Sequence, residues 1–211
     1  MAKAGADQKA RSWLKEPTQK RARRTRNKIV EAARDLFAQR GFEETTTTLI
    51  AERAGVSIGS IYAHFNDKWD IFLVILEAFQ REVYSFLELG LDKIMKEKMD
   101  LGQALEWLVR GLFKAHDLNG KLNLESTKFA LMDERARAIR SEWEGKEDQK
   151  VLELLEFYAD RTKVDNTAAA AILLHQLNHV VFQFLFQHKG QVDEKVILDE
   201  LIKMQKSYLA K

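Results

Sequence analysis

The chain of 211 residues contains one proline, Pro17, and only ten glycines. Folds built from many short strands need frequent turns, and proline and glycine are the residues that form most turns. Apolar residues instead recur at helical spacing, and no stretch shows the alternation of apolar and polar residues that is typical of a strand. The first helical series is Ile29, Ala32, Ala33, Leu36 and Phe37. The sequence therefore predicts an all-α fold.

Start and stop signals divide the pattern into segments. The first helix ends at Gly41, and a cluster of threonines from Thr45 to Thr48 offers N-caps for a short second helix that ends at Gly55. Ser57 is placed to cap a third short helix, and Asp67 followed by Asp70 resembles the capping box of a long fourth one. Further helices are expected at about 101–117, 121–132, 134–161, 166–188 and 192–209.

The charge is unevenly distributed along the chain. Residues 1–30 carry ten Lys and Arg against two acidic residues, so the remainder is net negative although the whole chain has a net charge of +2. A basic end suggests contact with a polyanion, and a solvated arm is the alternative. No uninterrupted apolar run reaches the roughly 18 residues that span a bilayer. We therefore expect a cytoplasmic protein that does not enter a membrane.

One motif at first suggests an enzyme. Gly55-Val56-Ser57-Ile58-Gly59 matches the G-x-S-x-G pattern of a hydrolase nucleophile elbow. That elbow requires a buried strand before the serine, whereas the residues before this motif, "TTLIAERA", have a helical pattern. The chain also has no cysteine, no glycine-rich phosphate loop and no paired-carboxylate motif. We expect neither an enzymatic activity nor a cofactor.

The same stretch has the spacing of a helix-turn-helix. Ile50, Ala54, Val56 and Ile61 are apolar where two short helices would bury their contact, and Gly55 lies where the turn needs positive φ. In this motif the N-terminal residues of the second helix face base edges in the major groove of DNA. The sequence therefore predicts a DNA-binding head.

The segment "GFEETTTTLIAERAGVSIGSIYAHFNDKWDIF" closely resembles the DNA-binding domain of TetR-family (tetracycline-repressor-like) transcription regulators. The resemblance covers roughly residues 25–72. It implies three parts: a basic arm over 1–22, a three-helix DNA-binding domain over 23–70, and a helical domain over 71–211 that binds an effector and forms a homodimer. The implied function is a repressor that a small, mostly apolar effector releases from a palindromic operator. Control by a protein partner, or by no effector, is the alternative, and an all-helical enzyme that uses the C-terminal domain is a distant one.

The resemblance also implies roles for individual residues. Hydroxyls at the start of the second helix are expected to bind phosphate, the recognition helix is expected to meet base edges and backbone, and Lys68 is expected to supply a charge to a phosphate. The arginines at 23, 24 and 26 are placed to reach phosphates or a minor groove. The expected DNA contacts are Arg26, Thr46, Thr48, Ser57, Ile58, Gly59, Ser60, Tyr62, His64 and Lys68.

Residues 167–190 are apolar on nearly all sides, so this helix needs partners on every face. One face can cover its own core, and the other predicts a homodimer in which this helix and the last helix form a four-helix seam. The expected interface residues are Leu173, Leu177, Val180, Phe184, Val196, Leu201 and Met204.

Aromatic, histidine and methionine side chains in the second domain are candidates for an effector pocket. The candidates are Trp107, Phe113, His116, Phe129, Met132, Trp143, His175, His179 and Phe182. His175 and His179 are four residues apart on one helical face, which is the spacing of a two-histidine metal site. No third ligand is evident beside them in the sequence, so we expect no metal. Packing, a place in the dimer seam and a hydrogen bond in the pocket remain open for this pair.

Overall fold

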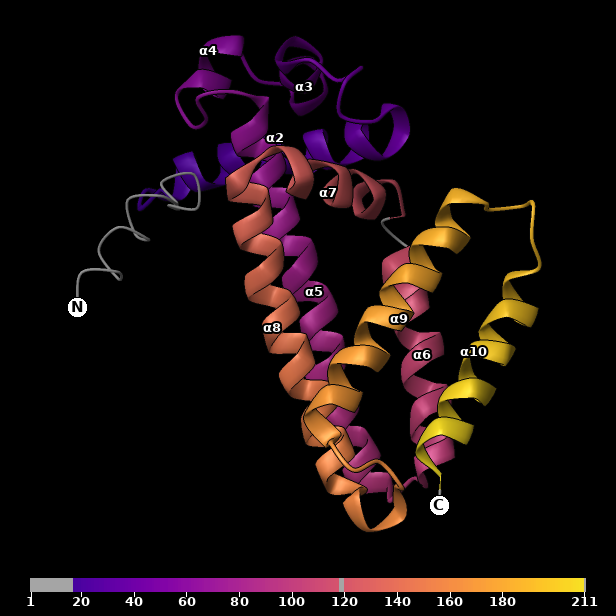
Figure 1. The fold of residues 1–211 in the computed structure, drawn as a ribbon. Coiled ribbons are helices and arrows are strands. Elements are labelled where there is room, and N and C mark those ends of the chain that lie inside the picture. The colour runs from indigo at the N-terminus through magenta and orange to yellow at the C-terminus, as the bar shows by residue number, and fades with distance from the viewer. Residues whose placement is uncertain (1–16, 118–119, 211) are drawn as a thin grey trace. The chain divides into compact units, whose positions relative to one another are not determined.

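Helices make up the regular structure of the residues that this computed structural model describes, 17–117 and 120–210 (Figure 1). Within these ranges the sole strand-like feature is an isolated bridge between Thr162 and Ala210. The predicted all-α fold is confirmed. The helices are α2 (Lys20–Arg40), α3 (Thr47–Ala54), α4 (Ile58–Tyr62), α5 (Lys68–Glu97), α6 (Leu101–Asp117), α7 (Gly120–Met132), α8 (Glu134–Phe157), the 3-10 turn η2 (Ala159–Arg161), α9 (Thr167–Gln187) and α10 (Glu194–Leu209).

Most boundaries lie within a few residues of those expected, and two differ for local reasons. Helix α4 has five residues and stops at Tyr62 rather than continuing to Phe65. Helix α8 ends at Phe157, where the predicted helix over 134–161 breaks into the 3-10 turn η2. Most of the expected arm over 1–22 lies outside the described residues, and α2 already begins at Lys20.

The chain divides into two compact units. The first contains residues up to Phe79 together with 125–139, and the second contains 80–124 together with 140–211. Helix α5 contributes its first twelve residues, 68–79, to the first unit and the rest to the second. The first unit is thus larger than the expected DNA-binding domain over 23–70, because it also includes most of α7 and the start of α8.

Aromatic side chains fill the core of the first unit. The ring of Phe42, from the loop between α2 and α3, lies 5.4 Å from Phe37, 5.4 Å from Phe72 and 4.7 Å from Phe129, measured between centroids. Such tilted and edge-on arrangements are the favourable ones for aromatic rings. The buried Asp70 starts α5 by accepting the backbone N–H of Asn66 and also pairs with Arg135 of α8 at 3.3 Å. These contacts hold the loop and α5 to the segment 125–139.

In the second unit, two glycines allow α5 and α6 to approach each other. The rings of Phe86 and Trp107 stack at 5.0 Å with an interplanar angle of 8°. A Cβ atom at Gly111 would lie 2.2 Å from Phe86, and one at Gly90 would lie 2.6 Å from Trp107. Each ring therefore occupies the space that a side chain on the opposite helix would need.

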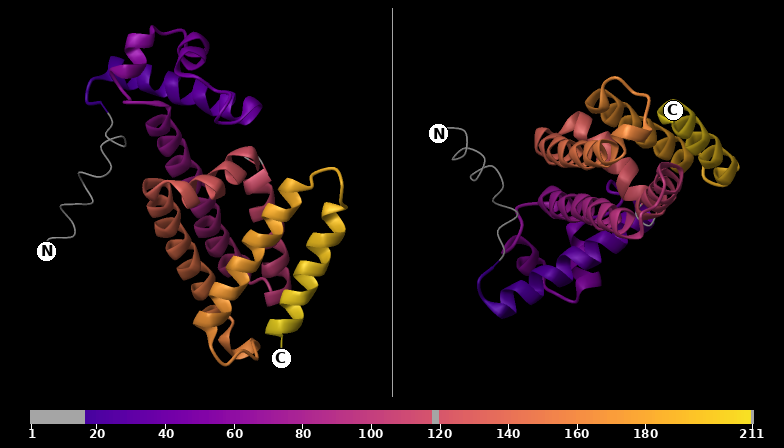
Figure 2. Two further views of the ribbon diagram at one scale, coloured as in Figure 1. Left: turned by 45° about the horizontal axis from the view of Figure 1, so that its top comes forward. Right: turned by 90° about the horizontal axis from the view of Figure 1, so that it is seen from below.

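Helices α9 and α10 form an antiparallel pair, seen side by side in both views of Figure 2.

Among the described residues α9 is the one helix long and apolar enough to span a membrane by length and composition, with a mean hydropathy of 1.4. Polar residues interrupt this helix, so its uninterrupted apolar runs are shorter than a membrane span. Five polar side chains lie in its middle, however, and polar groups are costly in lipid; they are His175, Gln176, Asn178, His179 and Gln183.

Candidate functional site

The two short helices of the first unit meet at a turn that the sequence specifies. Thr46 caps α3, with its side chain accepting the N–H of Leu49 at 3.2 Å. Gly55 ends α3 in the left-handed region, at φ 65°, and the N–H of Val56 returns to the carbonyl of Ala51. This is the glycine-dependent end of a helix that a Cβ would strain. Ile50, Ala51 and Ile61 are buried, so α3 and α4 pack as a helix-turn-helix.

Helix α4 buries Ile61 and turns its other large side chains outward. Ser57 caps it by accepting the N–H of Ser60 at 3.2 Å, and the two hydroxyl oxygens lie 2.9 Å apart. Ile58 is 43% exposed and Tyr62 is 57% exposed, although both are large enough to be core residues. Gly59, also exposed, lies between them. The structure thus brings the expected base-reading residues onto one open surface.

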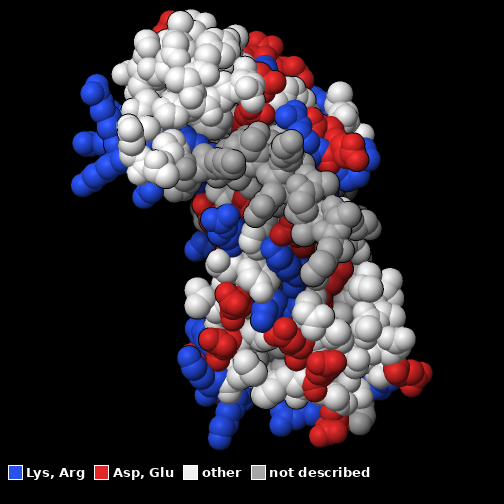
Figure 3. Space-filling model, turned by 90° about the vertical axis from the view of Figure 1, so that its left-hand side faces the viewer, with Lys and Arg blue, Asp and Glu red and all other residues white. Residues whose placement is uncertain are grey.

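Tyr62 also connects the two helices. Its hydroxyl lies 3.3 Å from Oγ1 of Thr47, while Thr46 and Thr48 on either side of Thr47 are exposed. Hydroxyls at a helix N-terminus beside an exposed tyrosine form a suitable phosphate contact. The surface over α4, at the top of Figure 3, carries few charged side chains. Charge attraction therefore has to come from around this surface rather than from α4 itself.

Lys68 has a different role from the expected one. Its ammonium donates to the carbonyl oxygens of Phe42, Glu43 and Thr45 at 2.8, 3.2 and 3.0 Å, and it lies 4.3 Å from the Phe42 ring. A lysine ammonium has three N–H donors, so these carbonyls use all of them. In this geometry Lys68 ties the α2–α3 loop to the start of α5 and has no donor left for a phosphate.

Arg26 does not fit the expected DNA contact either. It is 5% exposed, and its guanidinium lies 5.1 Å from the centre of the Phe65 ring. His64 is half-buried beside them, and burial, followed by the charge of Arg26, lowers the pKa of His64. Arg26 therefore belongs to the core of the domain, whereas Arg23 and Arg24 are exposed. The spacing of Arg26 from Ile29 and Ala33 is the signal that places it on the buried face of α2.

The expected pocket residues are not one site. Phe129 lies in the aromatic core of the first unit, Met132 is 71% exposed, and Trp143 packs on Tyr84 at 5.5 Å. Phe113 packs between Phe182 and Phe186. Trp107 lines an open groove of about 790 Å³ along α5 and α6. The residues that line the groove are Phe86, Glu97, Met99, Gln103, Glu106, Trp107, Arg110, Gly111 and Lys114.

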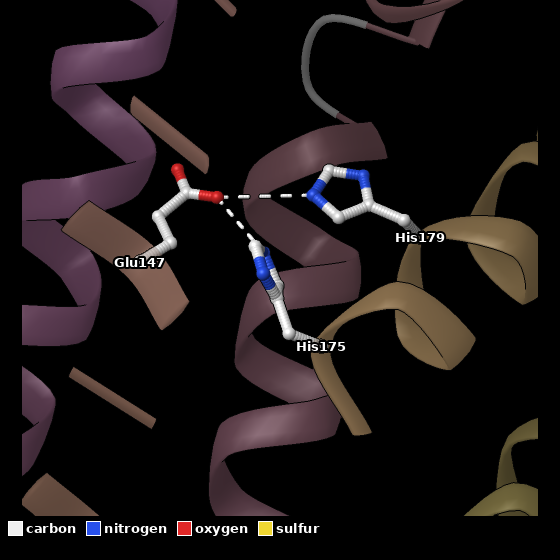
Figure 4. Close-up of side chains that lie close together, drawn as sticks. All are labelled: Glu147, His175 and His179. Carbon is white, nitrogen blue, oxygen red and sulfur yellow. Dashed lines mark hydrogen bonds and ion pairs between the residues drawn. The ribbon is translucent and has the colours of Figure 1, made fainter. Parts of the chain in front are cut away.

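The remaining candidates, His116, His175, His179 and Phe182, line a separate cavity of about 20 Å³ inside the second unit. Figure 4 shows Glu147 of α8 and the two histidines of α9 pointing toward one another. Oε2 of Glu147 lies 3.0 Å from Nε2 of His175 and 3.7 Å from Nε2 of His179. The fold therefore places beside the histidine pair a carboxylate that is not evident near them in the sequence, 28 residues before His175.

The charges in this cluster depend on one another. Burial alone would raise the pKa of Glu147, but the hydrogen bonds of His175 and His179 outweigh it and lower this pKa to about 2. Burial lowers the pKa of His175, and the hydrogen bond and charge of Glu147, with those of Asp148, raise it above its usual value. Burial also lowers the pKa of His116, to about 4. The cluster therefore contains a carboxylate, a histidine that attracts a proton and a histidine that stays neutral.

Six of the seven expected interface residues are at least partly exposed in the single chain. Leu173, Val180 and Phe184 on α9 are 61%, 65% and 42% exposed, and Val196 and Met204 on α10 are 56% and 50% exposed. Leu177 lies on the same face of α9 and is half-buried. Leu201 is 4% exposed and packs in the core of the unit, so its assignment to the interface is wrong.

An all-helical chain with an exposed recognition helix in a helix-turn-helix defines a DNA-binding regulator. Residues 29–75 match the model of the bacterial regulatory proteins of the tetR family. Over 162 residues the chain is 27% identical to the HTH-type transcriptional repressor AcnR of Corynebacterium efficiens, a region that covers 76% of this chain and 80% of AcnR. These matches identify the DNA-binding part of the chain as that of a TetR-family transcriptional regulator.

Solved structures agree with the fold along most of the chain. A crystal structure described as a TetR-family regulator of Mesorhizobium loti superposes with a TM-score of 0.72 at 17% identity and covers 92% of this chain and all of that one. A SmeT–triclosan complex superposes with a TM-score of 0.67 at 19% identity, over 89% of this chain and 92% of that one. At these identities the likeness concerns the fold alone.

Proposed function

We propose that this protein is a cytoplasmic, non-enzymatic repressor that binds a palindromic operator as a homodimer and is released by a small, mostly apolar effector. The observation that carries DNA reading is the surface of α4, where Ile58 and Tyr62 are exposed beside Ser57, Gly59 and Ser60. An aliphatic side chain suits the methyl group of thymine, and hydroxyls accept or donate to several base edges. No element among the described residues of its own unit covers this surface.

The case for a homodimer rests on the apolar surface of α9 and α10. Leu173, Val180 and Phe184 recur at intervals of seven and four residues, so they form one stripe along α9. Val196 and Met204 extend it onto the neighbouring α10. Large exposed apolar patches are unusual on monomers and mark interaction sites. Two copies packed through these helices present two recognition helices, which suits an operator with two half-sites.

The open groove along α5 and α6 is our candidate for the effector site. Its volume of about 790 Å³ lies within the usual range for sites that hold drug-sized molecules. The stacked rings of Phe86 and Trp107 offer an aromatic surface, and Arg110 and Glu106 offer polar contacts. An aromatic compound of modest polarity fits this lining. The related fold of SmeT in a complex with triclosan makes triclosan a reasonable first probe.

The coupling between effector and DNA rests on the continuity of α5. This helix begins at Lys68, which is bound to the loop before α3, and it carries Phe86 at the groove. A ligand that prefers one orientation of α5 therefore changes the reading of DNA without touching it. Such coupling is typically worth about 1–3 kcal/mol and is reciprocal. Operator DNA should thus weaken effector binding by the same factor as the effector weakens DNA binding.

Selection of bound sequences from random duplex DNA tests the core of this proposal. The expected result is a palindromic site whose two halves are spaced by about one helical turn, roughly 34–36 Å. Enrichment of no sequence would overturn the assignment of α4. Titration of triclosan with and without that operator then tests the effector. Equal affinity in both conditions would reject coupling through triclosan and favour control by a protein partner or by no effector.

A further inference from the structure

Three of the five histidines of the chain gather around one cavity in the second unit. His175 and His179 come from successive turns of α9, and His116 comes from α6. Glu147 of α8 faces them with a side chain that is 2% exposed. One nitrogen from each histidine of α9 and one oxygen from Glu147 all lie within 4.8 Å of one another. This cluster lies entirely within the second unit and has no part in the DNA-reading surface.

The separations suit ligands around one ion. Zinc binds imidazole nitrogen and carboxylate oxygen at about 2.0–2.2 Å, so neighbouring ligands in a tetrahedral site are roughly 3.4 Å apart. The distances from Oε2 of Glu147 to the two Nε2 atoms, 3.0 and 3.7 Å, lie on either side of that value. Small side-chain shifts would therefore bring all three atoms to bonding distance of a central ion.

A second carboxylate fixes the orientation of His175. Oδ1 of Asp148 lies 2.6 Å from Nδ1 of His175, on the side of the ring opposite Glu147. With the proton on Nδ1 donated to Asp148, an ion that displaces the proton between Nε2 and Glu147 meets the lone pair of Nε2, which faces the cavity. Histidines that bind metals nearly always donate their other N–H to a carboxylate or carbonyl in this way. The same relation exists at His116, where Nδ1 lies 2.8 Å from the carbonyl oxygen of Leu112.

The volume of the cavity favours an ion over an organic molecule as its ligand. Its volume of about 20 Å³ holds one water molecule or one ion, which needs about 10–15 Å³ by the same measure. An effector of drug size needs a cavity at least ten times larger. One buried atom of the proposed ligand groups, Oε1 of Glu147, has no hydrogen-bond partner among the described residues. A buried carboxylate oxygen usually has a partner, and a bound ion or its water supplies one.

We propose that Glu147, His175 and His179 bind one divalent transition-metal ion of the zinc class, with Asp148 positioning His175. Two imidazoles and one carboxylate are a ligand set for zinc, iron or cobalt, while magnesium and calcium prefer oxygen ligands alone. Because Glu147 lies on α8 and both histidines lie on α9, the ion crosslinks these helices. The site does not depend on the proposed function, since it is measured without DNA.

The test uses the full chain, freed of metal by dialysis against a chelator and titrated with Zn²⁺ and Co²⁺ by calorimetry and visible absorption. We expect one ion per chain and a Co²⁺ spectrum typical of four or five ligands. Glu147→Gln and His179→Gln should weaken binding by more than about 100-fold, and Asp148→Asn by about 10–100-fold, the usual effect of removing such a supporting group. Zn²⁺ should also raise the melting temperature of the wild type.

His188→Gln is the matched control, because His188 lies at the end of the same helix but outside the cavity. It should bind both ions as the wild type does. Binding that is absent in the wild type, or unchanged in both Glu147→Gln and His179→Gln, would overturn the site, and so would its loss in His188→Gln. If either substitution at the cluster prevents folding, as circular dichroism would show, Asp148→Asn and the wild-type Co²⁺ spectrum decide the question.

Discussion

The Cβ atom that Gly59 lacks would lie 3.8 Å from Oγ of Ser57, which is an ordinary van der Waals distance. Packing within the protein therefore does not require glycine at this position, and its φ is not in the left-handed region. Alanine is the better helix former by about 1 kcal/mol. The fold itself therefore gives no reason for glycine at position 59. A glycine here would instead allow another molecule to approach the backbone of α4 closely.

Gly59→Ala should consequently have opposite effects on stability and on binding. We expect the free energy of unfolding to rise by up to about 1 kcal/mol, since helix propensity improves and no contact is lost. Operator affinity should fall, because the added methyl group lies on the surface that we propose approaches DNA. Thermal melts and fluorescence anisotropy with the selected operator measure the two quantities. Unchanged affinity would show that the backbone of α4 does not approach the duplex.

Ser60→Ala should weaken specific binding by about 1–3 kcal/mol if its hydroxyl contacts a base edge. The N–H of Ser60, which donates to the Ser57 cap, is retained in this variant. Affinity for unrelated duplex DNA should stay the same, because base contacts carry the sequence preference. Ser141→Ala, an exposed serine of α8, is the matched control. Equal loss on specific and unrelated DNA would point to a phosphate contact instead.

Lys68→Met tests the role that the structure gives to this lysine. The thioether retains much of the packing on Phe42 but leaves three carbonyl oxygens without their donor. Unsatisfied, partly buried acceptors cost about 1–3 kcal/mol of stability. The slope of log affinity against log salt should stay as in the wild type. A slope smaller by about 0.9 would instead reveal a direct phosphate contact.

Val180→Asp should convert the proposed dimer into a folded monomer. Val180 is 65% exposed in the single chain, so the charge costs little there, but it would be buried and unpaired in the seam. Sedimentation at micromolar concentration measures the change. Leu89→Asp, on an equally exposed leucine of α5, should leave the wild-type assembly intact. A wild type that is itself monomeric would reject the interface.

A pair of glycine substitutions tests the contact of α5 with α6. Gly111→Ala should lower stability by about 1–3 kcal/mol, because the new methyl group would lie 2.2 Å from Phe86 and force the stacked rings apart. At Gly145, within α8, a Cβ meets nothing within 4 Å, so Gly145→Ala should raise stability by up to about 1 kcal/mol. Urea unfolding of both variants measures the change in the free energy of unfolding, which should be negative for Gly111→Ala and positive for Gly145→Ala.

The helices were predictable because periodicity and caps are local. Thr46, Gly55 and Ser57 act within a few residues of their own positions, and the structure shows each at the end of a helix where the sequence places it. The reading surface of α4 follows from the same local signals. The role of Lys68 was not predictable, since its three carbonyl partners lie 23 to 26 residues away in the sequence and depend on how the loop folds.

Only the two histidines of the cluster formed by Glu147, Asp148, His175 and His179 could be predicted from the sequence. His175 and His179 share a face by helical spacing, but Glu147 and Asp148 lie in a stretch rich in both charges, "SEWEGKEDQK", which is typical of a solvated helix. Which of its acidic residues turns inward is decided by the packing of α8 against α9. Leu201 was misassigned for a similar reason, because several faces of α10 are apolar and the sequence does not show which one its neighbours cover.

The apolar stripe on α9 and α10 exposes a newly synthesised chain to aggregation before it dimerises. If the proposed dimer forms, each chain exposes Leu173, Val180 and Phe184 to solvent until it meets a second copy. The folding of one chain does not depend on protein concentration, whereas dimerisation does. At low concentration the apolar surface of α9 and α10 therefore stays exposed for longest. Exposed apolar surface during that time favours aggregation and capture by chaperones. Under the proposed assembly, slow synthesis and dilution are thus the conditions that most endanger the protein.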